Sequence, residues 1–115
     1  MGGGSEEDAE QTVTSRPVIF HPEADQELNK AIDWYLEVKR SPRAAAGLAD
    51  AVESAVREIA SDPQGWPVHT LGTQRFKLKR YPYLAIYVVF EEHIEIVAIA
   101  HTRRRTGYWK HRLSR

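Results

Sequence analysis

The sequence predicts an α+β domain in which an antiparallel helix hairpin packs on one face of a small antiparallel sheet, in the order β-α-α-β-β-β. Two observations lead to this class. A short apolar run is followed by two stretches whose apolar residues recur every three or four positions, and after residue 73 the period changes to two. The 115 residues suffice for one domain, and 42% hydrophobic residues suffice for a core that needs no disulfides.

The first strand and the first helix are predicted from residues 18–38. Residues 18–20 form a short apolar run, and Pro22 suits the first turn of a helix, where its missing N–H costs nothing. The following apolar residues lie on one helical stripe; they are Ala24, Leu28, Ala31, Ile32 and Tyr35. Glu23 and Glu27 share another face with Lys30 beside them, which we interpret as a solvated surface.

The second helix is predicted to start at Ser41-Pro42. Ser41 can cap the helix with its hydroxyl, and Pro42 suits the first helical position. Apolar residues then recur at helical spacing from Leu48 to Ile59, and Asp62-Pro63-Gln64-Gly65 ends the pattern with two helix breakers. Two antiparallel helices joined by a short link follow from this spacing.

Three strands are predicted in the second half of the chain. Residues 74–80 alternate apolar and cationic side chains, as a strand with one wet face does. Residues 83–90 are almost continuously apolar, which is typical of a central strand covered on both faces, and residues 94–100 follow after Glu91-Glu92-His93. The three segments are predicted to form an antiparallel meander.

The formal net charge is zero, but the charge is unevenly distributed. Residues 1–16 contain four acids against Arg16 alone and have no apolar periodicity. We interpret them as a flexible acidic extension or a cloning remnant, and residues 17–115 as a single domain with a basic C-terminal tail. That tail, residues 101–115, contains six Lys and Arg residues and no acid.

Several classes of protein are excluded by composition. The chain has no cysteine, so a disulfide scaffold, a thiolate nucleophile and a zinc ribbon are ruled out. Its five histidines show no metal-ligand spacing and no glycine-rich phosphate loop is present, so neither a metal nor a cofactor is predicted. The longest apolar run is far short of the ~20 residues of a membrane helix, which favours a soluble cytoplasmic protein without a membrane partner.

A set of short motifs resembles the RelE/ParE toxin superfamily, and its ParE-like branch in particular. The motifs are His21-Pro22-Glu23-Ala24, Trp34-Tyr35, Asp62-Pro63, Phe76-Lys77-Leu78, Tyr81-Pro82-Tyr83, Ile86-Tyr87, and His101 followed by Arg104 and Tyr108-Trp109. The resemblance covers about residues 17–113. It implies a bacterial toxin of a type II toxin–antitoxin module, active in plasmid stabilisation or growth arrest and neutralised by an antitoxin in a hetero-oligomer.

The resemblance implies two different targets. ParE-like members are implied to poison DNA gyrase without being enzymes, and we favour this interpretation. RelE-like members are implied to be ribosome-dependent mRNA endonucleases. Cleavage by the 2′-OH needs a proton acceptor, a cation for the phosphate and a proton donor for the leaving oxygen. The candidates for these roles are Lys77, Lys79, Arg80, His101, Arg104 and Tyr108.

Each candidate also has a structural interpretation. Lys77 and Lys79 can simply solvate one face of a strand, and His101 can hydrogen-bond to the backbone at the end of a buried strand. Trp109 is predicted to pack back on the sheet, whereas Tyr108 can serve as a stacking platform. Of the adjacent pair Trp34 and Tyr35, the tyrosine is assigned to the core and Trp34 to the lip of an antitoxin-binding groove.

The basic tail predicts a surface that contacts the target or nucleic acid. Consecutive guanidiniums repel one another unless an anion or an acidic partner is near. The residues assigned to this surface are Arg103, Arg104, Arg105, Lys110 and Arg112. They also allow a further alternative, a non-enzymatic module that only binds a partner or nucleic acid.

Overall fold

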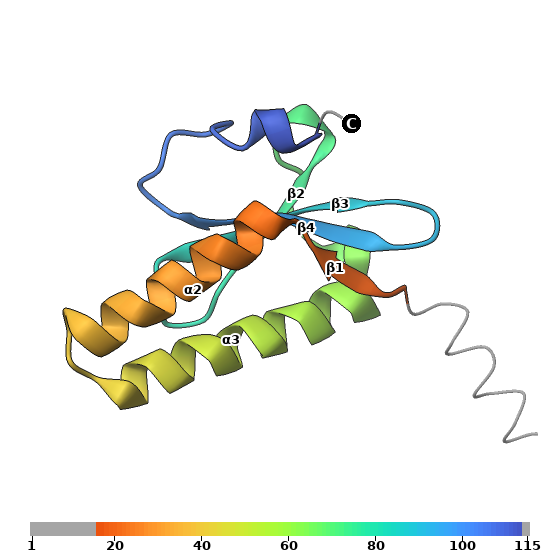
Figure 1. The fold of residues 1–115 in the computed structure, drawn as a ribbon. Helices are drawn as coiled ribbons and strands as arrows, with labels where there is room; N and C mark the ends of the chain where they lie inside the picture. Colours follow the sequence, from red (N-terminus) through yellow and green to blue (C-terminus); the bar gives the residue numbers. More distant parts are fainter. Residues whose placement is uncertain (1–15, 114–115) are drawn as a thin grey trace, which may run out of the picture.

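The computed structural model describes residues 16–113, and the predicted order of elements is confirmed within them (Figure 1). The elements are β1 (Val18–Phe20), α2 (Pro22–Glu37), α3 (Pro42–Ser61), β2 (Gln74–Lys77), β3 (Tyr83–Val89) and β4 (Ile94–His101). Three short 3₁₀ turns complete the chain, η1 (Pro63–Gly65), η2 (Thr70–Gly72) and η3 (Lys110–Leu113). The expectation of an acidic extension over residues 1–16 falls, apart from Arg16, outside the described residues.

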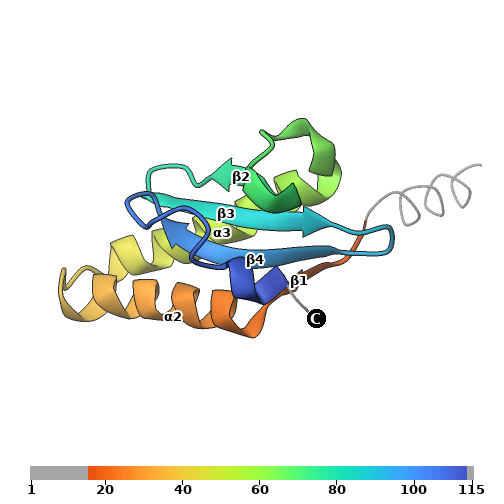
Figure 2. The same ribbon diagram turned by 90° about the horizontal axis from the view of Figure 1, so that it is seen from above.

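The four strands form one sheet in the order β1-β4-β3-β2 (Figure 2). The pairs β2–β3 and β3–β4 are antiparallel, as the predicted meander requires. β1 pairs with β4 in parallel, with Val18 opposite Ile94 and Phe20 opposite Ile96, so the sheet as a whole is mixed. A parallel pair needs a long crossover connection, and the helix hairpin with the rest of the sheet supplies it.

Both helices begin where the sequence indicates. His21 accepts a hydrogen bond from the Glu23 backbone N–H through Nδ1 (3.0 Å), so this histidine caps α2. The hydroxyl of Ser41 likewise accepts from the backbone N–H of Ala44 (3.1 Å) at the start of α3. In both helices a proline occupies the first turn, where no intrahelical N–H bond is lost.

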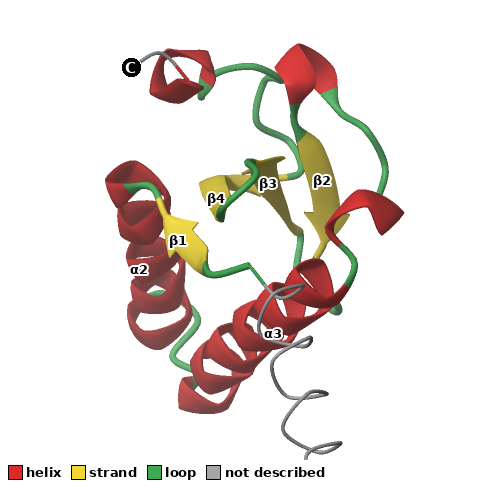
Figure 3. Ribbon diagram, turned by 90° about the vertical axis from the view of Figure 1, so that its right-hand side faces the viewer, coloured by secondary structure: helices red, strands yellow, loops and turns green. Residues whose placement is uncertain are grey.

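The sheet has a hydrophobic layer on each face. The helix hairpin covers one face (Figure 3), where Leu48 and Ile59 of α3 pack with Tyr87 and Ile96 of the sheet. The other face is covered by the C-terminal segment, and its central side chain is Trp109, which is 1% exposed. The predicted core position of Trp109 is therefore confirmed, and the C-terminal segment belongs to the folded domain.

β2 is shorter than the predicted strand of residues 74–80. Phe76 and Leu78 are buried as expected, but the strand ends at Lys77 because Arg80 adopts a positive φ of 71° in the turn that follows. Within residues 16–113, no helix is long and apolar enough to span a membrane.

Candidate functional site: a cleft between the first helix and the last strand

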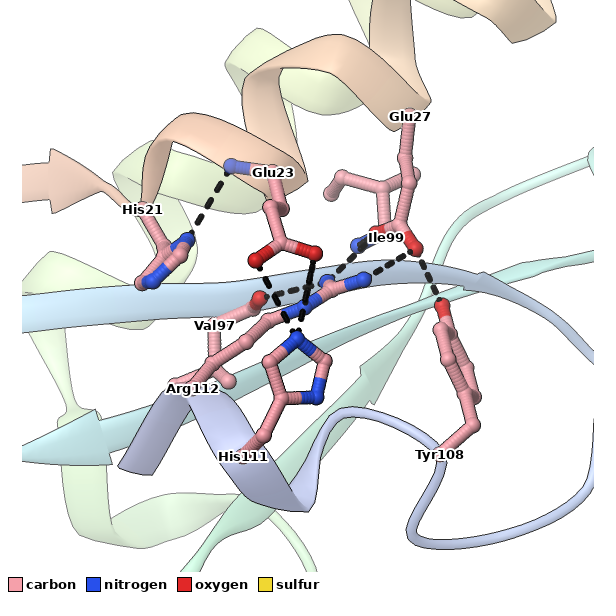
Figure 4. A network of polar contacts seen from close by, with 8 residues as sticks. All are labelled: His21, Glu23, Glu27, Val97, Ile99, Tyr108, His111 and Arg112. Atoms are coloured by element: carbon pink, nitrogen blue, oxygen red, sulfur yellow. Dashed lines mark hydrogen bonds and ion pairs between the residues drawn. The ribbon is translucent and has the colours of Figure 1, made fainter. Parts of the chain in front are cut away.

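The polar centre of the site is an ion pair between α2 and the C-terminal segment (Figure 4). Arg112 donates from both terminal guanidinium nitrogens to the two carboxylate oxygens of Glu27, each at 3.0 Å. Such a two-pronged contact fixes orientation as well as charge. The Arg112 side chain is 5% exposed and that of Glu27 18% exposed, so the pair is largely withdrawn from water.

This pair corrects two expectations from the sequence. Glu27 does not lie on a solvated helix face, and Arg112 does not belong to the exposed basic surface, because each neutralises the other inside the fold. Burial opposes the charge of Arg112, but the hydrogen bond and attraction of Glu27 outweigh it and raise the pKa of the guanidinium. Spacing along α2 alone did not reveal this role, since the partner of Glu27 lies 85 residues away.

The side chains of Glu27 and Arg112 form hydrogen bonds with the backbone of β4 that a neighbouring strand would otherwise form. The β3–β4 register pairs Ile86 with Ala98 and Tyr87 with Ile96, which leaves Val97 as an extra residue, a β-bulge. The Val97 carbonyl accepts from Arg112 (3.0 Å), and the Ile99 N–H donates to Glu27 (3.0 Å). β1 ends opposite Ile96, so these side chains satisfy the edge of β4 where β1 stops.

Tyr108 completes the network. Its hydroxyl donates to Glu27 Oε2 at 2.6 Å, and the guanidinium of Arg104 lies over its ring, 3.8 Å from the centroid. Burial and then the hydrogen bond and charge of Glu27 raise the pKa of the phenol far above its ordinary value. The proton therefore stays on Tyr108, where it is committed to the carboxylate, and one face of the ring is covered by Arg104.

Glu23 makes a second set of polar contacts beside this pair. His111 Nε2 is 3.1 Å from Glu23 Oε2, and Arg112 Nε is 3.4 Å from Glu23 Oε1. The hydrogen bond from His111, with the charges of Arg112 and His21, lowers the pKa of Glu23 although partial desolvation opposes the shift. Both acids on this face of α2 thus hold the C-terminal segment in place.

An open cleft of about 490 Å³ adjoins this network, between α2, the end of β4 and the C-terminal segment. Its lining brings together four residues that the sequence singled out, which are Trp34, His101, Arg104 and Tyr108. Its remaining walls are mostly apolar and aromatic; they are Ala31, Tyr35, Pro82, Tyr83 and Ile99, with Glu27 and Lys30 as the other polar residues. Lys30, Tyr83 and Glu27 are members of the site that sequence reasoning missed.

His101 stands at the end of β4 with its ring already engaged. Its Nδ1 accepts the backbone N–H of Arg103 (3.1 Å), and its ring packs edge-on against Tyr83 with centroids 5.3 Å apart. Because an acceptor nitrogen carries no proton, the neutral ring has its proton on Nε2. The structural role predicted as one alternative for His101 is present, and the ring also contributes a polar edge to the cleft.

Other predicted catalytic residues do not line this cleft. Lys77 Nζ donates to the carbonyls of Leu78 (2.8 Å) and Tyr81 (2.7 Å), so it stabilises the turn between β2 and β3. Lys79 forms an exposed ion pair with Glu58 of α3 at 3.4 Å. Arg80 is exposed in the turn with positive φ.

The remaining residues of the predicted basic surface are exposed. Arg103, Arg105 and Lys110 lie in and after the loop that follows β4, and none has a carboxylate partner among residues 16–113. Arg105 and Lys110 line a second, shallow hollow with Thr70 and Thr106. This hollow lacks any acidic residue and presents two free cations to an anionic partner.

The fold and the site describe a small α+β binding domain with an aromatic, cation-rimmed cleft and an adjacent basic loop. A family model described as the ParE toxin of the type II toxin–antitoxin system parDE matches residues 18–106. The chain belongs to this family of toxins, and the ParE-like assignment from the sequence motifs is confirmed.

A solved structure shares the fold. It is described as the chromosomal ParDE toxin–antitoxin system from P. aeruginosa, and it is similar with a TM-score of 0.67 and 21% sequence identity. The match covers 76% of this chain and 97% of that chain. No curated protein sequence matches the chain significantly.

Proposed function

We propose that this toxin arrests growth by inhibiting DNA gyrase and that a cognate antitoxin neutralises it by direct binding. Membership in the ParE family supports the toxin–antitoxin context. The proposed target lies in the cytoplasm, where we expect the protein to act.

The observation that favours gyrase inhibition over mRNA cleavage is that Tyr108 is already engaged by contacts within the protein. Its proton is held by Glu27 and one face of its ring is covered by Arg104, so it is not a free proton donor and one of its two stacking faces is taken. The basic nitrogen of His101 accepts a backbone N–H, and Lys77 and Lys79 are bonded elsewhere. An RNA-cleaving site needs such groups free and converging on one phosphate.

The exposed loop after β4 is the proposed target-contacting surface. Arg103, Arg105 and Lys110 are free of intramolecular ion pairs among the described residues, and Arg104 connects this loop to the cleft through Tyr108. Clustered cations without acids attract an anionic surface and speed the encounter with it. Arg112 is not part of this proposal because its charge is satisfied by Glu27.

Induced expression without an antitoxin tests the proposal, with gyrase supercoiling and ribosome-dependent mRNA cleavage assayed in parallel on the purified protein. We expect growth arrest, loss of supercoiling and intact mRNA. Cleaved mRNA with unaffected gyrase would establish the RelE-like alternative. Normal growth would favour a module that only binds a partner.

A further inference from the structure

The shallow hollow beside the loop after β4 has two positive charges that form no internal ion pair. It is a space of about 460 Å³, lined by Arg105 and Lys110 with Thr70, Leu71, Thr106, Gly107 and Tyr108. Both cations are exposed, and neither has a carboxylate partner among residues 16–113. The lining contains no acid, so like charges face one hollow without compensation. A bound anion removes this repulsion, and the hollow is therefore suited to a negatively charged ligand.

Two residues of the lining also offer backbone donors. A turn begins at Arg105, whose carbonyl accepts from the Tyr108 N–H (3.4 Å), and Gly107 adopts a φ of 89° within it. The N–H groups of Thr106 and Gly107 have no acceptor in the described part of the chain. A Cβ at Gly107 would meet no other heavy atom within 4 Å, so the backbone here is open to a ligand. Backbone N–H groups, hydroxyls and basic side chains are the donors that proteins use to bind phosphate.

Leu71 lines the same hollow in an unfavourable backbone conformation. Its φ is 62°, a left-handed value that costs free energy for a leucine, and the residue is 54% exposed. The turn is fixed by the buried Thr73, whose N–H (3.2 Å) and hydroxyl (2.7 Å) both donate to the Thr70 carbonyl. The fold therefore presents an apolar side chain to solvent in a lining that also holds two cations. Such a side chain suits the apolar carbons of a sugar next to a bound phosphate.

These features favour duplex DNA among the ligands that carry phosphate. A single strand is bound largely by aromatic side chains on which its bases stack. Tyr108 is the one aromatic residue of the lining, and Arg104 covers one face of its ring. In a duplex the phosphates and sugars form the outer surface, which matches cations, hydrogen-bond donors and one apolar side chain. An RNA duplex carries 2′-hydroxyls on its sugars, for which the side chain of Leu71 offers no hydrogen-bond partner.

We propose that this hollow binds the phosphate backbone of duplex DNA, with Arg105 and Lys110 at the phosphates and Leu71 against a neighbouring deoxyribose. The inference rests on the proposed function, because the DNA in question is the duplex on which gyrase acts. The toxin then contacts the nucleic acid as well as the enzyme. Phosphate contacts fix position without reading bases, so this binding does not depend on the DNA sequence.

Binding of a short fluorescent DNA duplex of arbitrary sequence to the purified toxin tests the proposal without gyrase. We expect Arg105→Ser combined with Lys110→Ser to weaken binding by about tenfold or more at low salt. The slope of log affinity against log salt concentration should fall by about two, one for each lost phosphate contact. Arg40→Ser with Arg43→Ser removes the same charge from exposed positions outside the hollow and is the matched control. Equal affinity and equal slope for the two double variants would overturn the proposal.

The contact of Leu71 with the sugar has its own variant. Leu71→Asn removes the apolar side chain, while asparagine tolerates the left-handed backbone. We expect this variant to bind the DNA duplex several-fold more weakly, with an unchanged salt slope, and to lose the preference of the native protein for DNA over an RNA duplex of the same sequence. Val68→Asn, at an exposed apolar residue outside the lining, is the control. A single strand or an RNA duplex that the native protein binds as tightly as the DNA duplex would overturn the assignment to duplex DNA.

Supercoiling assays on the same proteins separate this inference from the proposed function. Gyrase inhibition by a native toxin that binds no DNA duplex would overturn the inference and leave the proposed function standing. DNA binding that requires Arg105 and Lys110, in a toxin that does not inhibit gyrase, would confirm the site and contradict the proposed function.

Discussion

Tyr108 and Glu27 are joined by a 2.6 Å hydrogen bond across 81 residues of sequence. The same carboxylate is held by both terminal nitrogens of Arg112. Glu27 therefore determines where the C-terminal segment lies, and with it the position of Arg104 over the Tyr108 ring. The exposed Arg104 is thus positioned, through Tyr108, by a residue of the first helix.

Removal of Arg112 is expected to destabilise the protein. In Arg112→Met the methionine fills part of the space, but Glu27 loses its counter-ion in a site that is mostly withdrawn from water. Breaking a buried pair by deleting one partner costs about 3 kcal/mol. Urea denaturation measures the change, with exposed Arg105→Met as the control. A loss under about 0.5 kcal/mol, the size of an ordinary surface effect, would contradict the role of this pair.

Loss of the Tyr108 hydroxyl is expected to leave toxicity intact. Tyr108→Phe keeps the ring under Arg104 and removes one of the hydrogen bonds to Glu27, so we expect about 1–2 kcal/mol of destabilisation. Growth arrest at equal protein level is the measurement, because a catalytic proton donor does not tolerate this change. Abolished growth arrest with a folded variant would return the nuclease alternative to first place.

Alkaline pH is expected to weaken the fold through Tyr87. Burial, with the nearby charge of Asp62, raises the pKa of this phenol to about 12 from 10.0, and its hydroxyl donates to the Pro63 carbonyl at 2.6 Å. A raised folded-state pKa stabilises the native state below pH 10, and this contribution disappears as the pH rises toward 12.

Urea unfolding between pH 9 and pH 12 checks the size of this effect. We expect the free-energy advantage of the native protein over Tyr87→Phe to shrink by about 2 kcal/mol across that range, since each pKa unit corresponds to about 1.4 kcal/mol. Tyr108→Phe is the useful comparison, because burial raises the pKa of that phenol in the same direction. A constant difference between native protein and Tyr87→Phe would refute the assignment.

Replacing Gly47 by alanine is not expected to stabilise the protein, although alanine is usually preferred to glycine inside a helix. A Cβ at this position in α3 would collide with the Tyr81 hydroxyl, which donates to the Ala44 carbonyl at 2.7 Å. We expect Gly47→Ala to be neutral or destabilising in the native protein. In a Tyr81→Ala background it should stabilise by about 1 kcal/mol, the ordinary helix preference, and a thermodynamic cycle of the four proteins measures the difference.

The basic loop is expected to matter for toxicity and not for stability. Arg103→Ser combined with Arg105→Ser removes two exposed cations that make no ion pair among the described residues. We expect gyrase inhibition to weaken by about tenfold and unfolding to change by less than about 0.5 kcal/mol. Arg40→Ser, in the link between the two helices, combined with Arg43→Ser, in the first turn of α3, is the matched control. Equal inhibition by the two double variants would remove the loop from the target surface.

The fold was predictable from sequence because its signals are local. The Ser41 cap, Pro22 in the first turn of α2, the two helical stripes and the change to period two each depend on residues close together in the chain. The parallel pairing of β1 with β4 was not predicted, since a three-residue run does not specify its partner or direction.

The site was only partly predictable for the same physical reason. Trp34, His101, Arg104 and Tyr108 drew attention by residue type, and the structure places them around one cleft. Glu27 was misread because a helical pattern shows which residues share a face and not what covers that face. The signal that could have indicated a partner for Glu27 is the lack of acids in the C-terminal tail. A cation of that tail that becomes buried requires an acid from elsewhere in the fold.

The pairing of the first strand with the last has a consequence for biosynthesis. β1 pairs with β4, which begins at Ile94, and Glu27 of the first helix pairs with Arg112. Both partners are synthesised long after the residues that they contact. A nascent chain therefore cannot close its sheet or position its C-terminal segment while those residues are still unmade. Translation that stops before residue 112 therefore yields a chain in which Glu27 has no guanidinium partner and the C-terminal segment does not cover its face of the sheet.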